Sequence, residues 1–135
     1  VLLIRVAMLI RRIEMPKMKV EKTFSFDSAH FLPYVPADHK CRNLHGHTYT
    51  VKVEAEGELD EAMGWGVDFG EVKKVAGPLV KQLDHKLLND IVGLENPTAE
   101  NVALWFWHQM KPALPELSQV TVMENPTNVV RYRGD

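Results

Sequence analysis

The sequence contains a single cysteine, Cys41, among its 135 residues. One cysteine cannot close a disulfide within the chain, which excludes the disulfide-stapled secreted folds and predicts a reducing, cytoplasmic location. The chain also lacks an excess of charge of either sign, because 16 basic residues stand against 18 acidic ones. A formal charge of -2 gives no basic field of the kind that nucleic-acid-binding proteins carry, so we expect no nucleic-acid partner.

A long apolar run is missing as well. Residues 1–13 are mostly apolar, but Arg5 interrupts them and they are too short to cross a bilayer. They also lack the charge-first order and the small-residue cleavage site of a secretory signal, so we expect no membrane partner. We predict that residues 1–17 are an extension outside the fold, such as results when the translation start is assigned too far upstream. Residues 18–135 are expected to form a single domain.

What the sequence does contain is a pair of histidines, His45 and His47, at the start of an alternating segment. From residue 48 to residue 56 the odd positions are apolar and the even positions polar, which predicts a strand with one buried face. Side chains at positions i and i+2 of a strand share a face. Both imidazoles therefore lie on the inward register.

A third histidine, His30, ends a segment in which Phe24 and Phe26 mark the even positions as the core face. If the two strands pair antiparallel, the end of the first lies beside the start of the second, and His30 meets His45 and His47. Three neutral imidazoles with a fourth position open are the ligand set of a catalytic zinc site. Two alternatives remain at this point: ordinary histidines in a half-buried sheet, or a site that Cys41 closes as a fourth ligand.

The rest of the chain reads as two helices followed by two short strands. The inward stripe of the first helix comprises Phe69, Val72, Ala76, Leu79, Val80 and Leu83. Asp68 is its expected N-cap, and Gly77-Pro78 is expected to kink or divide it. Thr98 is the expected N-cap of the second helix, with Glu100 in its first turn.

Strands grouped apart from helices predict an α+β fold, with a four-stranded antiparallel sheet and two helices on one face. The predicted order is strand, strand, helix, helix, strand, strand, with the last strands near residues 119–124 and 129–133. Trp105 and Trp107 cannot both lie on one face of a helix, which indicates a subunit contact.

Three further groups carry possible chemistry. Glu124 follows Val120 and Val122 at even spacing, so its carboxylate is expected on their face, where it could bind an amidine-like edge such as that of a pterin or a guanine. The alternative register leaves Glu124 in solvent. Asp84 and His85 could form an acid–base pair only if the helix ends before them. Cys41 stands between two basic residues, which favours a thiolate that acts as base or nucleophile.

These residues resemble the 6-pyruvoyltetrahydropterin synthase family, and most closely its queuosine-pathway branch, the 6-carboxytetrahydropterin synthases. The motifs that carry the resemblance cover residues 19–134 and are Phe24–His30, Cys41-x-x-x-His45-Gly46-His47, Asp68-Phe69, Leu83-Asp84-His85-x-x-Leu88-Asn89, Asn96–Asn101 and Glu124. The three-residue gap between Cys41 and His45 looks like the carboxy branch. One departure is Asn125-Pro126 after Glu124, where family members often carry threonine.

The resemblance implies the tunnelling fold, in which subunits join their sheets into a barrel, commonly as homo-hexamers with active sites at subunit interfaces. It implies Zn²⁺ on His30, His45 and His47, Cys41 as general base, Asp84 with His85 as a second proton-transfer unit, and Glu124, Thr98 and Glu100 as substrate-binding residues. The implied reaction converts 7,8-dihydroneopterin triphosphate to 6-carboxy-5,6,7,8-tetrahydropterin, acetaldehyde and triphosphate, in queuosine biosynthesis.

Two other functions fit the same residues. One is the elimination catalysed by the pyruvoyl branch, which retains the carbon chain of the substrate. The other is a metal- and pterin-binding module without turnover. Cys41 separates the last from the enzymes, because a binding module needs only the histidines.

Overall fold

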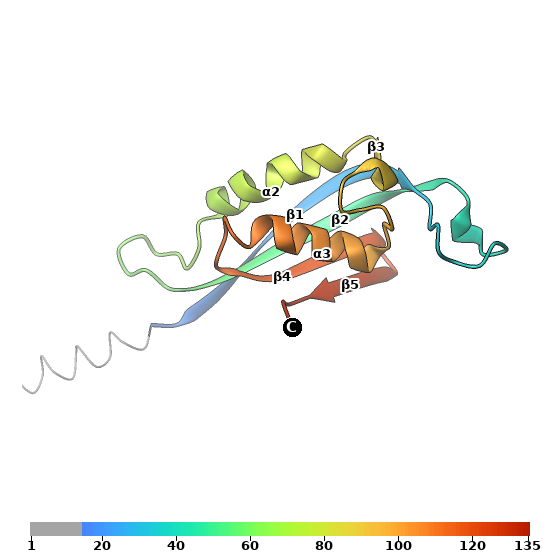
Figure 1. The fold of residues 1–135 in the computed structure, drawn as a ribbon. Coiled ribbons are helices and arrows are strands. Elements are labelled where there is room, and N and C mark those ends of the chain that lie inside the picture. Colours follow the sequence, from blue (N-terminus) through green and yellow to red (C-terminus); the bar gives the residue numbers. More distant parts are fainter. Residues whose placement is uncertain (1–14) are drawn as a thin grey trace, which may run out of the picture.

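A computed structural model describes residues 15–135, and its architecture is α+β (Figure 1). The strands are β1 (Lys17–His30), β2 (His45–Glu58), β3 (Lys86–Leu87), β4 (Leu117–Asn125) and β5 (Asn128–Tyr132), the helices are α2 (Phe69–Leu83) and α3 (Ala99–Met110), and the single-turn 3₁₀ segments are η1 (Lys40–Arg42) and η2 (Leu88–Asp90). Helices α2 and α3 lie on one face of the sheet (Figure 1). The predicted fold class is therefore confirmed.

The sheet differs from the predicted one by one strand. Among residues 15–135 it has five strands, in the order β3-β1-β2-β4-β5, where four were predicted. The additional strand, β3, pairs in parallel with Ser28 and Ala29 of β1. Two residues are too few to show an alternating pattern, so the sequence carries no signal for this strand. The first strand also begins at Lys17, within the predicted extension, of which residues 1–14 lie outside the described residues.

Strands β1 and β2 pair antiparallel over their whole length, from Lys17 opposite Glu58 to His30 opposite His45. The end of β1 thus lies beside the start of β2, as the sequence predicted. Along β2 the odd residues Tyr49, Val51 and Val53 are completely buried. This register carries His45 and His47 on the helix-covered side of the sheet, because they precede Tyr49 at the same spacing of two.

Helix α2 begins where the sequence predicted, because the Asp68 side chain accepts a hydrogen bond from the Gly70 amide. The predicted inward stripe is buried except for Phe69, which is 55% exposed and was wrongly placed in the core. Of the two outcomes expected at Pro78, a kink or a division, the division is wrong, since α2 continues through this residue. Pro78 lies on the exposed side of the helix, where a carbonyl that loses its amide partner can bond to water.

Helix α3 is buried on more than one side. Trp105 and Trp107 are both largely covered within the chain, at 7% and 9% exposure. The Trp107 ring meets the edge of Tyr132 on β5, with centroids 5.3 Å apart, while Trp105 lies against the loop at Gly93. The subunit contact inferred from these tryptophans was therefore wrong, because the chain itself supplies the second surface.

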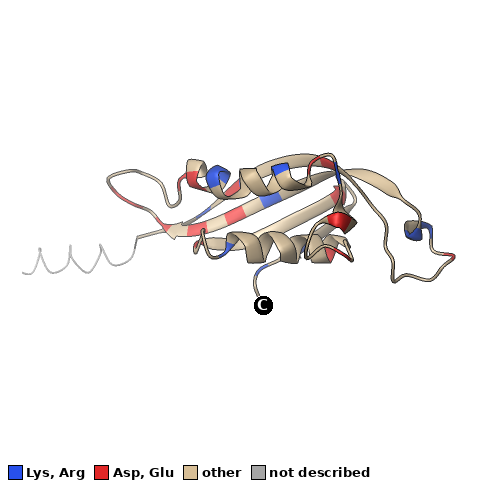
Figure 2. Cartoon of the chain, turned by 45° about the horizontal axis from the view of Figure 1, so that its top comes forward, with Lys and Arg blue, Asp and Glu red and all other residues tan. Residues whose placement is uncertain are grey.

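Charged residues of both signs are interspersed along the strands and helices (Figure 2). This distribution agrees with the small net charge. Among the described residues, no helix has both the length and the apolar character that a membrane span requires.

Candidate functional site

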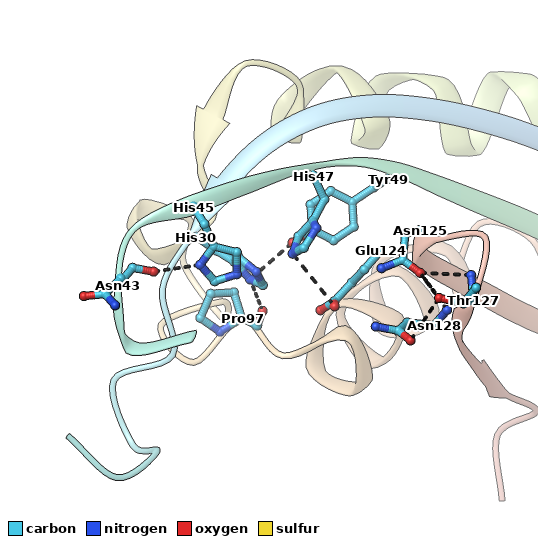
Figure 3. A network of polar contacts seen from close by, with 10 residues as sticks. All are labelled: His30, Asn43, His45, His47, Tyr49, Pro97, Glu124, Asn125, Thr127 and Asn128. Atoms are coloured by element: carbon cyan, nitrogen blue, oxygen red, sulfur yellow. Dashed lines mark hydrogen bonds and ion pairs between the residues drawn. The ribbon is translucent and has the colours of Figure 1, made fainter. Parts of the chain in front are cut away.

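The three predicted histidines converge at the end of the β1–β2 hairpin (Figure 3). The ring centroid of His30 lies 4.5 Å from that of His45 and 5.1 Å from that of His47, and the His45–His47 separation is 5.1 Å. One nitrogen from each ring lies within 4.8 Å of the others. The predicted convergence is confirmed, and it follows from strand register alone.

Main-chain carbonyls fix the orientation of two of these rings. His30 Nδ1 lies 2.8 Å from the Pro97 carbonyl oxygen, and His45 Nδ1 lies 2.7 Å from that of Asn43. A carbonyl only accepts, so both Nδ1 atoms carry a proton and each ring presents Nε2 as its possible ligand atom. This is the arrangement in which an imidazole binds a metal through one nitrogen and donates from the other.

Two buried nitrogen atoms of the cluster lack hydrogen-bond partners within the described part of the chain. His30 Nε2 and His47 Nε2 are both buried without a hydrogen bond. Burial lowers the pKa of His30 and of His47, so both rings are neutral near pH 7. Buried imidazole nitrogens that lie close together without a hydrogen bond fit a metal ion, and an all-nitrogen set of three suits zinc.

A cavity of about 420 Å³ contains this cluster. Its lining residues are His30, Leu32, Lys40, Cys41, His45, His47, Glu124, Asn125 and Asn128. Cys41 reaches it from η1, in the 31–44 loop that extends from the body of the molecule (Figure 1). Its sulfur is not among the ligand atoms that meet within 4.8 Å, although it faces the same space.

Glu124 enters this cavity at the point where β4 becomes irregular. The pairing of β4 with β5 shifts register between Met123 and Asn125, so Glu124 is the extra residue of a bulge. Such bulges redirect a side chain. Glu124 Oε2 lies 3.8 Å from His47 Nε2, and the side chain is 21% exposed. The register with Glu124 on the side of Val122 is confirmed, and the solvent-facing alternative is wrong.

Asp84 and His85 form the predicted pair, but they lie outside the cavity that contains Cys41. Helix α2 ends at Leu83, and His85 adopts a positive φ of 57°, which is uncommon outside glycine. Its Nδ1 then lies 3.1 Å from Asp84 Oδ2. The Asp27 amide donates to Asp84 Oδ1, at 2.9 Å, and this bond together with the one from His85 lowers the pKa of Asp84.

His85 lines a second cavity of about 640 Å³, not the one that Cys41 lines. This cavity includes His85 and Lys86 together with His47, which borders both cavities. The His85 side chain is 78% exposed. Within one chain, then, Cys41 and His85 do not face the same space.

The two remaining predicted site residues lie at the start of α3. Thr98 caps the helix, because its hydroxyl accepts a hydrogen bond from the Asn101 amide at 3.1 Å. Glu100 is exposed in the first turn. Neither lines the cavity of its own chain, so their role in substrate binding stays a prediction.

Sequence reasoning missed the residues that hold this site in place. Asn89 accepts from the Phe31 amide and donates to the Phe31 carbonyl, which ties the strand end after His30 to the segment after β3. His39 caps η1 by accepting from the Cys41 amide at 3.1 Å. Asn89 is part of the motif that begins at Leu83 and could have been found from it. The contact between His39 and the Cys41 amide lies within a loop and has no sequence signal.

Comparison with known proteins agrees with this site. The chain matches the family described as 6-pyruvoyl tetrahydropterin synthase over residues 19–135. It is 40% identical over 119 residues to the 6-carboxy-5,6,7,8-tetrahydropterin synthase of Synechocystis, covering 84% of this chain and 91% of that one. It is 39% identical over 99 residues to the dihydroneopterin monophosphate aldolase of Pyrococcus furiosus, covering 73% and 80%.

A solved structure gives the same result. The 6-pyruvoyl tetrahydropterin synthase of Caenorhabditis elegans superposes with a TM-score of 0.83 at 31% identity, covering 90% of this chain and 98% of that one. The chain therefore belongs to the 6-pyruvoyl tetrahydropterin synthase family. It is an enzyme of the lyase class.

Proposed function

We propose that this protein converts 7,8-dihydroneopterin triphosphate and one water to 6-carboxy-5,6,7,8-tetrahydropterin, acetaldehyde and triphosphate, with zinc as its metal. The observation that carries the proposal is the single cavity that contains the three-histidine cluster, Cys41 and Glu124. The carboxy branch is favoured by the three-residue gap between Cys41 and His45 and by the similarity to the Synechocystis enzyme.

His30, His45 and His47 would hold the metal through the three nitrogens that face one another. When bound there, zinc would serve as a Lewis acid toward the hydroxyl oxygens of the substrate side chain and make the neighbouring C–H groups more acidic. The Pro97 and Asn43 carbonyls would keep the His30 and His45 rings in orientation throughout turnover.

Glu124 would bind the pterin ring. A carboxylate accepts two parallel N–H bonds from an edge that presents an amino group beside a ring N–H, as it does from arginine. The pterin edge has this form at its 2-amino group and N3–H. Because Glu124 lies 3.8 Å from His47, a ring held there would direct its side chain toward the histidine cluster.

Cys41 would be the general base that removes a proton from the substrate side chain. It lines the cavity, and its position outside the group of converging ligand atoms supports a base over a fourth ligand. General-base catalysis of this kind accounts for about 10²–10⁴ in rate.

Asp84 and His85 would supply the second proton transfer from another copy of the chain. The carboxylate holds the imidazole by its Nδ1, which leaves Nε2 free to exchange a proton with the substrate. Since His85 and Cys41 border different cavities in one chain, a shared site needs a second chain. We therefore propose a homo-oligomer, a hexamer as in the family, whose interfaces complete the active sites and bring in Thr98 and Glu100.

The reaction would take place in the cytoplasm as a step of queuosine biosynthesis. The pyruvoyl elimination is the second candidate, since the chain is also 37% identical over 108 residues to human 6-pyruvoyl tetrahydrobiopterin synthase. The two reactions use the same substrate and differ in whether the carbon chain is cleaved.

The test is to incubate the zinc-loaded protein with 7,8-dihydroneopterin triphosphate and to identify the products by mass. Acetaldehyde together with a carboxypterin is the expected result. A pyruvoyl product without acetaldehyde assigns the protein to the other branch, and unchanged substrate that stays bound identifies a binding module.

A further inference from the structure

The turn between β4 and β5 is organised by one side chain, that of Asn125. Its Oδ1 accepts three hydrogen bonds, from the Thr127 amide at 2.9 Å, the Thr127 hydroxyl at 2.8 Å and the Asn128 amide at 2.9 Å. The two ends of an asparagine side chain are told apart by their partners. Three donors converge on one atom, so that atom is the oxygen and the amide orientation is fixed.

The nitrogen end of this amide is left for the cavity. Within residues 15–135, Asn125 Nδ2 has no hydrogen-bond partner, and the residue lines the same cavity as Glu124. Figure 3 shows the oxygen directed at the turn and the nitrogen directed toward the Glu124 side. Asn125 also directly follows the bulge at Glu124, so both side chains approach the cavity from one irregular stretch of strand.

We propose that Asn125 is a specificity-determining residue that donates an N–H bond to the ring carbonyl of the pterin, next to the groups that Glu124 accepts. This inference rests on the proposed function. Along one edge, a pterin presents an acceptor (O4), a donor (N3–H) and a second donor (the 2-amino group). The Asn125 amide and the two Glu124 oxygens present a donor and two acceptors, which is the complementary order.

The locked amide gives the site a selectivity that a hydroxyl does not. A hydroxyl at this position could rotate to donate or to accept. The Asn125 side chain presents only its N–H donors to the cavity, because its oxygen is already occupied by the turn. Asn125 therefore favours a carbonyl at this position of the ring and disfavours an amino group there.

The experiment uses the conservative variant Asn125→Asp in the zinc-loaded full chain. An aspartate keeps an oxygen for the three turn bonds but replaces the N–H donor with an acceptor. The matched control is Asn128→Asp, which adds the same charge to the same cavity wall, where the Asn128 oxygen has only a 3.5 Å contact with the Thr127 hydroxyl. The measurement is the dissociation constant of 6-carboxypterin by fluorescence, with the thermal midpoint as the check on folding.

We expect Asn125→Asp to weaken 6-carboxypterin binding by about 10–100-fold, the loss for one hydrogen bond left unpaired in a site, and Asn128→Asp to weaken it several-fold less. Equal losses in the two variants would assign the effect to charge and overturn the inference, as would an Asn125→Asp variant that binds like the wild type. Glu124→Gln tests the proposed function separately. If the wild type does not bind the ligand, or if Glu124→Gln leaves binding intact, the pterin assignment fails and the inference with it.

Discussion

The histidine cluster and the Asp84–His85 pair are built in opposite ways. The histidines belong to two long paired strands, face the helix-covered side, and have two of their rings held by main-chain carbonyls. The pair follows the end of a helix, has a histidine in a left-handed backbone conformation, and is largely exposed. One region is complete within the chain, and the other presents its reactive groups outward.

This difference separates two properties of the protein. The three histidines proposed as metal ligands need only a correctly folded chain, since a single hairpin brings them together. The proposed proton transfer by His85 at the cavity of Cys41 needs a second chain, because the two residues border different cavities. Metal binding should therefore be a property of the subunit, and turnover a property of the assembly. The following predictions test this division, beginning with the largest expected effect.

Removing one imidazole should abolish both metal binding and turnover. We expect His45→Ala to lose its zinc, measured by elemental analysis of the purified protein, and to have no product formation above background, because two histidines remain of three ligands. His108→Ala is the matched control, since His108 is exposed near the end of α3 and belongs to no cluster. A His45→Ala protein with one zinc per chain would contradict the assignment of the metal site.

Removing the thiol should abolish turnover and leave metal binding intact. Cys41→Ala is expected to keep its zinc and to lose turnover by about 10²–10⁴, because a general base is lost while all three imidazoles remain. The measurement pairs metal content with the rate of triphosphate release. If zinc content falls together with the rate, Cys41 is a metal ligand and its assignment as base is wrong.

Mixing two inactive proteins should restore activity if sites are shared between subunits. Cys41→Ala and His85→Ala are each expected to be inactive alone. After unfolding and refolding together in equal amounts, random pairing across an interface leaves one site in four with both wild-type residues, so about a quarter of the wild-type rate should return. Rates that stay at the level of the separate variants would place both residues in one subunit's site.

The smallest effect is expected at the helix that supports His30. Thr98 caps α3 next to Pro97, whose carbonyl accepts from His30. Thr98→Ala should lower the free energy of unfolding by about 1 kcal/mol, measured in urea, and should retain zinc. An unchanged stability with a large rise in KM would instead show that the hydroxyl binds substrate in the assembly.

The histidine cluster could be predicted from the sequence, because the side chains of a strand alternate with a fixed period of two. That period placed His45 and His47 on one face, and antiparallel pairing then brought His30 beside them. The same reasoning placed Glu124 with Val122. It succeeded because alternation over many residues leaves only one register that buries the apolar side.

The remaining features depend on contacts that have no local pattern. The carbonyls of Asn43 and Pro97 hold two rings, yet every residue has a carbonyl. Phe69 was misplaced because a helical stripe does not say where the covering surface ends. The tryptophans suggested a partner that the chain supplies from Tyr132 and the loop at Gly93, far away in sequence.

The most direct test of the central claim is a zinc titration of the metal-free protein in the presence of 7,8-dihydroneopterin triphosphate, with acetaldehyde measured as it forms. If three histidines of each chain hold one catalytic zinc, the rate should rise in proportion to added zinc and level off at one zinc per chain. A full rate without zinc, or a plateau at one zinc for several chains, would contradict the claim that each subunit carries a complete metal site.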